Sequence, residues 1–210
     1  MDGGIQERGM MGGTREEKGA KVQRIMTLLA ALVCVVLLPG CSAGTSNDVP
    51  EDIRVGKERL TYTAADQQTA YENPVVLNVA EISQIDEGGV YQLTGVSSNT
   101  LIVDAEDQNV HLLLSGVTIR SRNGPGLEVR SAGKVFLPRQ AGTENVIVDS
   151  PYFPEDTEAN AAIYAVCDLT INGEGELEVA GYHKDAIHTK DVFKLIGGHL
   201  HLQAKRTGIR

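Results

Sequence analysis

Oxygen-bearing side chains gather in two short stretches of this 210-residue chain. Four lie within residues 149–161 (DSPYFPEDTEANA) and one follows a short turn, and together they are Asp149, Asp156, Glu158, Asn160 and Asp185. Calcium takes about six to eight oxygen ligands, which carboxylates and loop carbonyls can supply. Carboxylates crowded together without a cation would repel one another. If the fold brings both stretches to one edge, they form a candidate calcium site; the alternative is a solvated acidic loop.

A second set of residues carries the aromatic and basic groups that suit a sugar. Its members are Tyr164, Tyr182, His188, Lys190 and Arg210. A tyrosine ring stacks on the CH groups of a sugar, while His, Lys and Arg donate hydrogen bonds to hydroxyls or uronate carboxylates. These five residues are the predicted carbohydrate contacts. The alternative is a solvated outer face without a ligand.

An internal repeat is what would bring these residues together. Ile163 recurs 24 positions later as Ile187 and again, after a slip of the register, as Ile209. A fixed period filled with short alternating strands indicates stacked supersecondary units. Because side chains alternate across a strand, inward isoleucines put Tyr164 and His188 on the outer face, about 4.8 Å apart along the stack.

The rest of the chain from position 75 also has the pattern of short strands. Apolar residues alternate in brief runs, and Gly, Asn, Asp or Ser interrupts them every six to ten residues. The chain has no tryptophan, which argues against a sandwich built around a buried Trp. The prediction is an all-β domain, a parallel β-solenoid over residues 75–210 with a core of stacked aliphatic side chains.

The first 41 residues predict export. The apolar run 26–38 (MTLLAALVCVVLL) follows three basic residues and is too short for a confident membrane span, as in a signal peptide. It ends in Leu-Pro-Gly-Cys, which resembles a bacterial lipobox and would make Cys41 the lipidated residue; the alternative is an ordinary secretory signal. Residues 42–74 are predicted as a polar tether and an irregular lead-in. The expected location is therefore the extracytoplasmic face of the bacterial membrane.

Charge and cysteine content argue against one class of partner and against an internal disulfide. The formal net charge of −9 argues against nucleic acid as a partner. Beyond the signal and lipobox, Cys167 is the last cysteine in the sequence, so no internal disulfide is expected.

Several pieces of residues 88–210 resemble a known family. They are GGVYQLTG, LIVDAEDQNVHLLLSGVTI, SAGKVFL, GTEN, ANAAIYAVCDLTINGEGELEV and KDAIHTKDVFKLIGG. They are similar to the bacterial carbohydrate-binding domain proteins with a polysaccharide-lyase-like, right-handed parallel β-helix. The resemblance implies binding of a cellulose- or pectin-like polysaccharide at the cell surface, structural calcium, and no firmly assigned catalytic residue.

The same resemblance sets two further expectations. Members of the family usually have additional coils, so the β-helix is expected to be truncated at Arg210. Arg206-Thr207 stand where the family has a pair of aspartates, which weakens the case for a cation site that depends on that coil.

Two other functions stay open. A calcium-dependent polysaccharide lyase acting by β-elimination would need a basic residue to take the C5 proton of a uronate, and Lys184, Lys190 or Arg210 are the candidates. A purely structural surface solenoid or adhesin would need neither a ligand nor a base.

Overall fold

The computed structural model describes residues 53–55 and 58–210. The described residues belong to one compact unit, residues 50–210. The predicted signal peptide and the lipobox cysteine, Cys41, lie outside the described residues. Within the described part of the chain, no helix has the length and apolar character needed to cross a membrane.

The described chain is all-β apart from one helical turn, α1 (Ala64–Gln67). The strands are, in order, β1 (Ile53–Val55), β2 (Glu58–Leu60), β3 (Val75–Asn78), β4 (Gln84–Ile85), β5 (Gly89–Ser97), β6 (Leu101–Arg120), β7 (Leu127–Arg139), β8 (Glu144–Val148), β9 (Ala161–Ala165), β10 (Asp168–Gly173), β11 (Glu176–Gly181), β12 (Asp185–Thr189), β13 (Phe193–Ile196) and β14 (His199–Ala204). The predicted irregular lead-in thus contains β1, β2 and α1.

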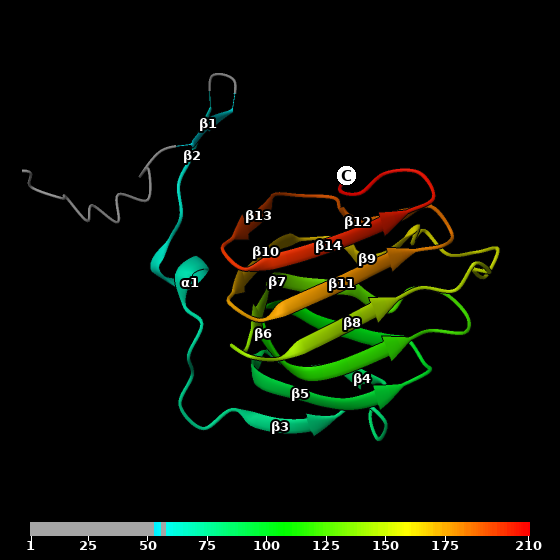
Figure 1. Ribbon diagram of the computed structural model, residues 1–210, viewed down its shortest axis with the longest axis horizontal. Coiled ribbons are helices and arrows are strands. Elements are labelled where there is room, and N and C mark those ends of the chain that lie inside the picture. Colours follow the sequence, from blue (N-terminus) through cyan, green and yellow to red (C-terminus); the bar gives the residue numbers. More distant parts are fainter. Residues whose placement is uncertain (1–52, 56–57) are drawn as a thin grey trace, which may run out of the picture. The chain divides into compact units, whose positions relative to one another are not determined.

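Strands β1 and β2 form an antiparallel pair, and the strands from β3 onward pair in parallel. The strands from β3 onward join one nearly closed, barrel-like sheet, in which β3, β5, the end of β6, β8, β11 and β14 follow one another across the view of Figure 1. Three ladders matter for the site. The first joins β6, β7, β9 and β12; the second joins β7, β10 and β13; the third joins β6, β8, β11 and β14.

The predicted repeat register is confirmed. Ile163 lies beside Ile187, which in turn bridges to Ile209, and Leu169 lies beside Phe193. Positions roughly one repeat apart in sequence are therefore direct neighbours across a parallel ladder.

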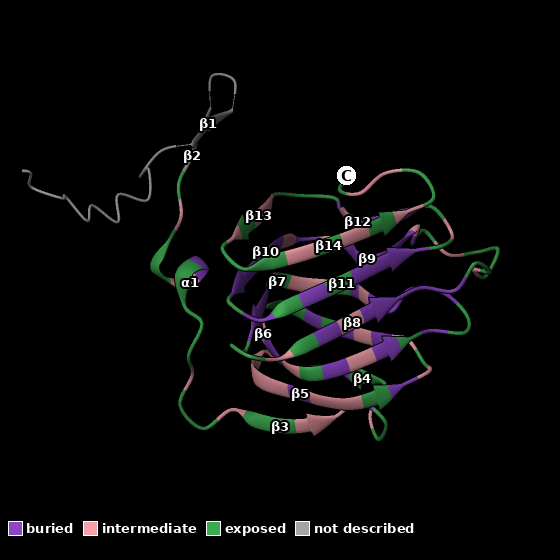
Figure 2. Ribbon diagram, viewed as in Figure 1, coloured by how far each residue is buried: buried purple, intermediate pink, exposed green. Residues whose placement is uncertain are grey.

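The inward side chains of these ladders form the core. Val103, Val129 and Ala165 lie in one row, and none of the three is exposed to solvent. Figure 2 shows buried segments on successive strands, among them β8, β9 and β11. Each fully buried Val, Leu or Ile stabilises a fold by about 1.5–3 kcal/mol, so aliphatic rows of this kind hold the ladders in register.

One buried arginine fastens the turns after β10 and β13. Arg139 donates from Nε to the carbonyl of Asn172 (3.0 Å), from Nη1 to that of His199 (2.8 Å), and from Nη2 to those of Gly173 (2.9 Å) and Gly197 (2.6 Å). Only 1% of Arg139 is exposed. The guanidinium thus provides a donor for each of these four carbonyls.

Candidate functional site

A groove of about 440 Å³ lies along the outer side of the first ladder. Its walls come from β6, β7, β9 and the loop between β8 and β9. Among the lining residues are Thr100, Glu128, Arg130, Asp156, Glu158 and Tyr164. Hydroxyl, carboxylate and guanidinium groups thus face one concave surface, which gives it both donors and acceptors.

The predicted outer column exists. Glu128 lies beside Tyr164, and Tyr164 lies beside His188, in the parallel register of β7, β9 and β12. The rings of Tyr164 and His188 meet edge to face with centroids 5.5 Å apart. The backbone N–H of Arg210 donates to the carbonyl of Ile187 at 3.0 Å, which places Arg210 next to His188. The repeat therefore brings these predicted carbohydrate contacts together.

Tyr164 differs from its prediction in one respect. It was expected to present an exposed ring, but only 3% of it is accessible to solvent. The edge of His188 and the ammonium of Lys190, 5.9 Å from the ring centroid, lie against it, and the loop of residues 149–160 lines the same groove. Its hydroxyl is buried and has no hydrogen-bond partner among the described residues. The ring is therefore not a flat platform, although Tyr164 is one of the residues that line the groove.

Two contacts fasten the acidic loop over this column. Glu158 accepts from Lys190 at 2.5 Å, and Nδ1 of His188 and Oδ1 of Asn160 lie 2.5 Å apart. The hydrogen bond lowers the pKa of Glu158 and is the main cause of a raised pKa at Lys190, to which the nearby Tyr164 side chain adds. Burial is the main cause of a lowered pKa at His188, with the positive charge of Arg210 adding to it.

Asp185 is held by an arginine. Both of its carboxylate oxygens accept from Arg206, from Nε at 2.8 Å and from Nη2 at 2.6 Å. Its side chain has no exposed surface, and the bond to Arg206 lowers its pKa. A bidentate guanidinium uses the lone pairs that a cation would need.

Asp149 is also buried and also bonded, but to the backbone. It accepts from the N–H groups of Tyr182 (2.5 Å) and His183 (3.3 Å), which ties the start of the long loop to the turn before β12. Burial raises the pKa of Asp149 to about 6, although these two hydrogen bonds act in the opposite direction.

These donors do not fit a calcium ion at the predicted corner. Asp149, Glu158, Asn160 and Asp185 each have a different partner, and Asp156 lines the groove. Within residues 53–55 and 58–210, no three or more His, Cys, Asp or Glu side chains form a group that can hold a metal ion. The calcium prediction therefore has no support from this donor set.

Tyr182 lies at the corner and outside the groove lining. Nearly half of it, 47%, is exposed. The neighbouring His183 stacks on Phe153, with ring centroids 4.2 Å apart. Tyr182 is thus the one predicted aromatic contact whose ring is open to solvent in the structure.

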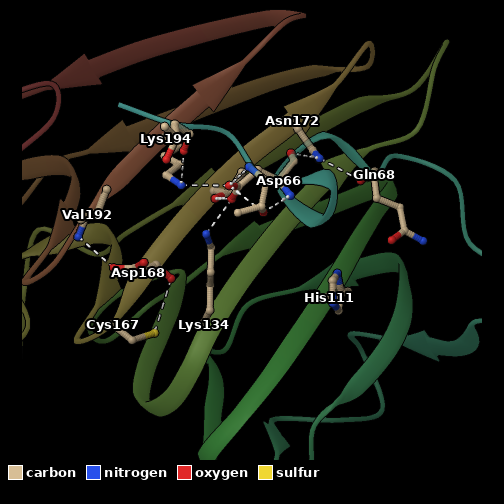
Figure 3. A network of polar contacts seen from close by, with 12 residues as sticks. Asp66, Gln68, His111, Lys134, Cys167, Asp168, Asn172, Val192 and Lys194 are labelled. Atoms are coloured by element: carbon tan, nitrogen blue, oxygen red, sulfur yellow. Dashed lines mark hydrogen bonds and ion pairs between the residues drawn. The ribbon is translucent and has the colours of Figure 1, made fainter. Parts of the chain in front are cut away.

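Sequence reasoning missed a buried polar cluster centred on Asp66. Its carboxylate accepts from Lys134 (2.6 Å), Lys194 (2.9 Å) and Thr170 (2.8 Å), as Figure 3 shows for the two lysines. Thr63 and Asp66 form a capping box around α1. A Thr followed three residues later by an acidic residue is a helix-start signal, so the helical turn could have been found. Its long-range partners could not, because they lie on three strands that are distant in sequence, β7, β10 and β13.

A family model for carbohydrate-binding domain-containing proteins matches residues 80–210. A carbohydrate-binding domain-containing protein of Acetivibrio thermocellus is 27% identical over 186 residues, which cover 85% of this chain and 65% of that protein. A polysaccharide lyase-like protein from C. thermocellum, solved as a gadolinium derivative, is 30% identical with a TM-score of 0.54, over 56% of this chain and 50% of the other. The chain thus spans half to two thirds of these relatives.

The family match covers more than half of the chain and includes every strand from β5 to β14. It therefore contains both walls of the groove and the column of Glu128, Tyr164 and His188. The chain belongs to the family of carbohydrate-binding domain-containing proteins.

Proposed function

We propose that this protein binds a cellulose- or pectin-like polysaccharide in the groove beside Tyr164. The observation that carries the proposal is the buried hydroxyl of Tyr164, which has no partner among the described residues and belongs to a residue that lines that groove. Leaving a buried polar group unpaired costs about 1–3 kcal/mol. A sugar hydroxyl can both donate and accept, so a bound glycan would remove that cost. Family membership supports the same class of ligand.

The charged lining suits hydroxyl-rich ligands. Glu128 accepts from Arg130 at 3.0 Å, and the carboxylate keeps further lone pairs for sugar hydroxyls. Half of the Arg130 side chain is exposed, so its remaining N–H groups can donate to a glycan oxygen. At the rim, Glu158 and Lys190 form an exposed ion pair that sugar hydroxyls can join.

The proposal includes the finer architecture and location. We take the parallel strands to wind as a right-handed parallel β-helix, which the confirmed 24-residue register favours. Export and lipidation at Cys41 would anchor the protein to the bacterial membrane, on its extracytoplasmic face, through a tether beginning at residue 42. The apolar run 26–38 and the Leu-Pro-Gly-Cys sequence support this part. Structural calcium stays a prediction.

Binding without turnover is the favoured form of the activity. A base for β-elimination works best with a pKa near the working pH. Lys190 donates to Glu158, which raises its pKa above the ordinary lysine value. This pairing opposes a role for Lys190 as the base.

The test is retention in native gels cast with soluble cellulose derivatives or polygalacturonate. Tyr164→Phe removes only the unpaired hydroxyl. We expect it to weaken retention by roughly three- to tenfold, the effect of one hydrogen bond. The same change should raise the melting temperature of the free protein by roughly 1–3 °C, because an unpaired polar atom has been removed.

The matched control is Tyr182→Phe, at the exposed corner outside the groove lining. It should leave both retention and melting temperature unchanged. Wild-type protein that no soluble or insoluble glycan retains would refute the proposal. A rise in ultraviolet absorbance with polygalacturonate and calcium would replace binding by lyase activity.

A further inference from the structure

Residues 61–74, called the strap below, lie against the outer side of β7, β10 and β13. Of these fourteen residues only Asp66 is buried, and none belongs to the apolar core. No backbone hydrogen bond joins the strap to a strand in the described part of the chain. The strap is therefore attached mainly by side-chain contacts to its few polar groups, with little of the burial of apolar surface that fixes most elements of a fold.

The surface beneath the strap is a ready-made receptor for a carboxylate. Lys134, Thr170 and Lys194 belong to three successive strands of the second ladder, β7, β10 and β13. Thr170 lies directly beside Lys194 in the ladder register, and all three side chains converge on the Asp66 carboxylate. The two ammonium groups and the hydroxyl hold the pKa of Asp66 well below its ordinary range. The same groups suit the carboxylate of a uronate.

A second observation points to a ligand at the same place. Asn172 is fully buried and donates from Nδ2 to the carbonyls of Asp66 and Gln68, both at 2.8 Å. Its Oδ1 atom is buried without a partner among the described residues. The surface beneath the strap therefore uses its donors in hydrogen bonds to the strap, while its acceptor, Oδ1 of Asn172, receives none from it. An acidic sugar has hydroxyl groups next to its carboxylate, and one of them can donate the hydrogen bond that Oδ1 of Asn172 does not receive from the strap.

The aromatic neighbours of the receptor extend it along the ladder. Phe136 lies beside Thr170 and stacks on His111, with parallel rings 4.3 Å apart. Tyr71 of the strap covers His111, and its hydroxyl lies 2.9 Å from Nδ1. The strap therefore shields a polar and aromatic surface, a combination typical of sugar sites.

We propose that the surface formed by Lys134, Thr170, Asn172 and Lys194 is a binding site for the carboxylate of an acidic sugar, and that Asp66 occupies it in place of the ligand. This inference rests on the proposed function, because it takes a polysaccharide as the ligand class. It adds a second site on a different ladder from the groove. Ligand and strap compete, so binding requires that the strap leaves its place.

The two lysines explain why the carboxylate of Asp66 and that of a ligand can compete with similar free energies. Among the described residues, Asp66 is the one carboxylate that pairs with either of them. Removing it leaves two positive charges with little solvent, which is strongly unfavourable unless another anion replaces it. A uronate restores both ion pairs and the bond from Thr170, so exchange of one carboxylate for the other changes the free energy little.

The experiment is calorimetry of the full chain with oligogalacturonate. Asp66→Ala releases the strap, and we expect the affinity to rise by at least about tenfold, because the apparent Kd is the intrinsic Kd divided by the fraction of open molecules. Adding Lys134→Ala and Lys194→Ala to this variant should abolish the gain. Glu144→Ala removes the same charge from an exposed position on the third ladder and should change nothing. A neutral cello-oligosaccharide should show no gain in any variant.

Hydrogen exchange of the wild-type protein gives a readout that does not depend on a variant folding. Saturating oligogalacturonate should speed exchange of the hydrogen-bonded strap amides, those of Thr63, Asp66 and Gln68, because the ligand displaces the strap. The proposal fails if exchange in the strap stays unchanged, or if the Asp66→Ala protein is less stable but binds no more tightly. The strap would then have a purely structural role. That result leaves the proposed binding in the groove beside Tyr164 intact, because that proposal fails only when wild-type protein binds no glycan at all.

Discussion

At the scale of single residues, three buried aspartates show how neighbours decide the behaviour of a carboxyl group. Asp185 faces a guanidinium and Asp66 faces two ammonium groups, and both have a lowered pKa. Asp149 has only backbone N–H donors, so burial prevails and raises its pKa to about 6. The first two stabilise the fold above the ordinary pKa of an aspartate and lose that contribution only as the pH falls toward their lowered values.

Asp149 has the opposite pH dependence. Its folded pKa is raised from 3.8 to about 6, so its contribution is complete below about 3.8 and is lost as the pH rises through 6. Asp149→Asn stays neutral throughout. We expect the variant to gain stability relative to wild type between pH 5 and pH 8, by roughly 2 kcal/mol or less. Thermal unfolding at both pH values measures the difference.

Comparing wild type with Asp149→Asn cancels the contributions of other titrating groups to the pH dependence of stability. His111 and His188, whose pKa values burial lowers, titrate nearby but are present in both. Parallel pH profiles for wild type and Asp149→Asn would show that Asp149 does not carry this dependence.

At the scale of elements, an ion pair joins β12 to the turn that follows β14. Arg206 donates to Asp185, and its backbone N–H donates to the carbonyl of Lys184 at 2.7 Å. Arg206→Ala leaves a buried carboxylate without its partner, so the melting temperature should fall by roughly 5 °C or more. Asp185→Asn in the same background should recover part of the loss.

Lys190→Ala is the matched control, because it breaks an ion pair that lies in solvent. Exposed pairs contribute little, so its melting temperature should stay near that of wild type. A chelator should leave wild-type melting unchanged if Arg206 fills the place of a cation at Asp185. A large fall on chelation would instead show a structural metal ion.

The same scale shows what the sequence could predict. The neighbours of Ile163 were predicted correctly, because inward aliphatic residues must repeat when strands stack in parallel. The burial of Tyr164 was not, because it depends on a long loop that folds over the column and has no counterpart in the repeat. The strap was missed for a related reason. One charged residue, Asp66, pairs with lysines 68 and 128 positions away, and a single residue leaves no periodic pattern in the sequence.

At the scale of the whole molecule, the two proposed sites share one strand. β7 contributes Glu128 and Arg130 to the groove and Lys134 to the receptor beneath the strap. The formal net charge of −9 repels acidic polysaccharides at long range, so attraction must come from local groups that salt screens over about 10 Å. A ligand long enough to reach both sites would turn its second contact into an intramolecular one.

This arrangement predicts a dependence on ligand length. In Asp66→Ala, long polygalacturonate should bind at least about tenfold more tightly per molecule than a trimer, because a trimer occupies one site and a polymer can occupy both. Adding Tyr164→Phe should weaken the polymer more than the trimer, since only the polymer engages the groove as well. Calorimetry with a series of defined lengths measures both effects. Equal losses for trimer and polymer would mean that the sites never hold one chain together, and the two surfaces would then bind independently.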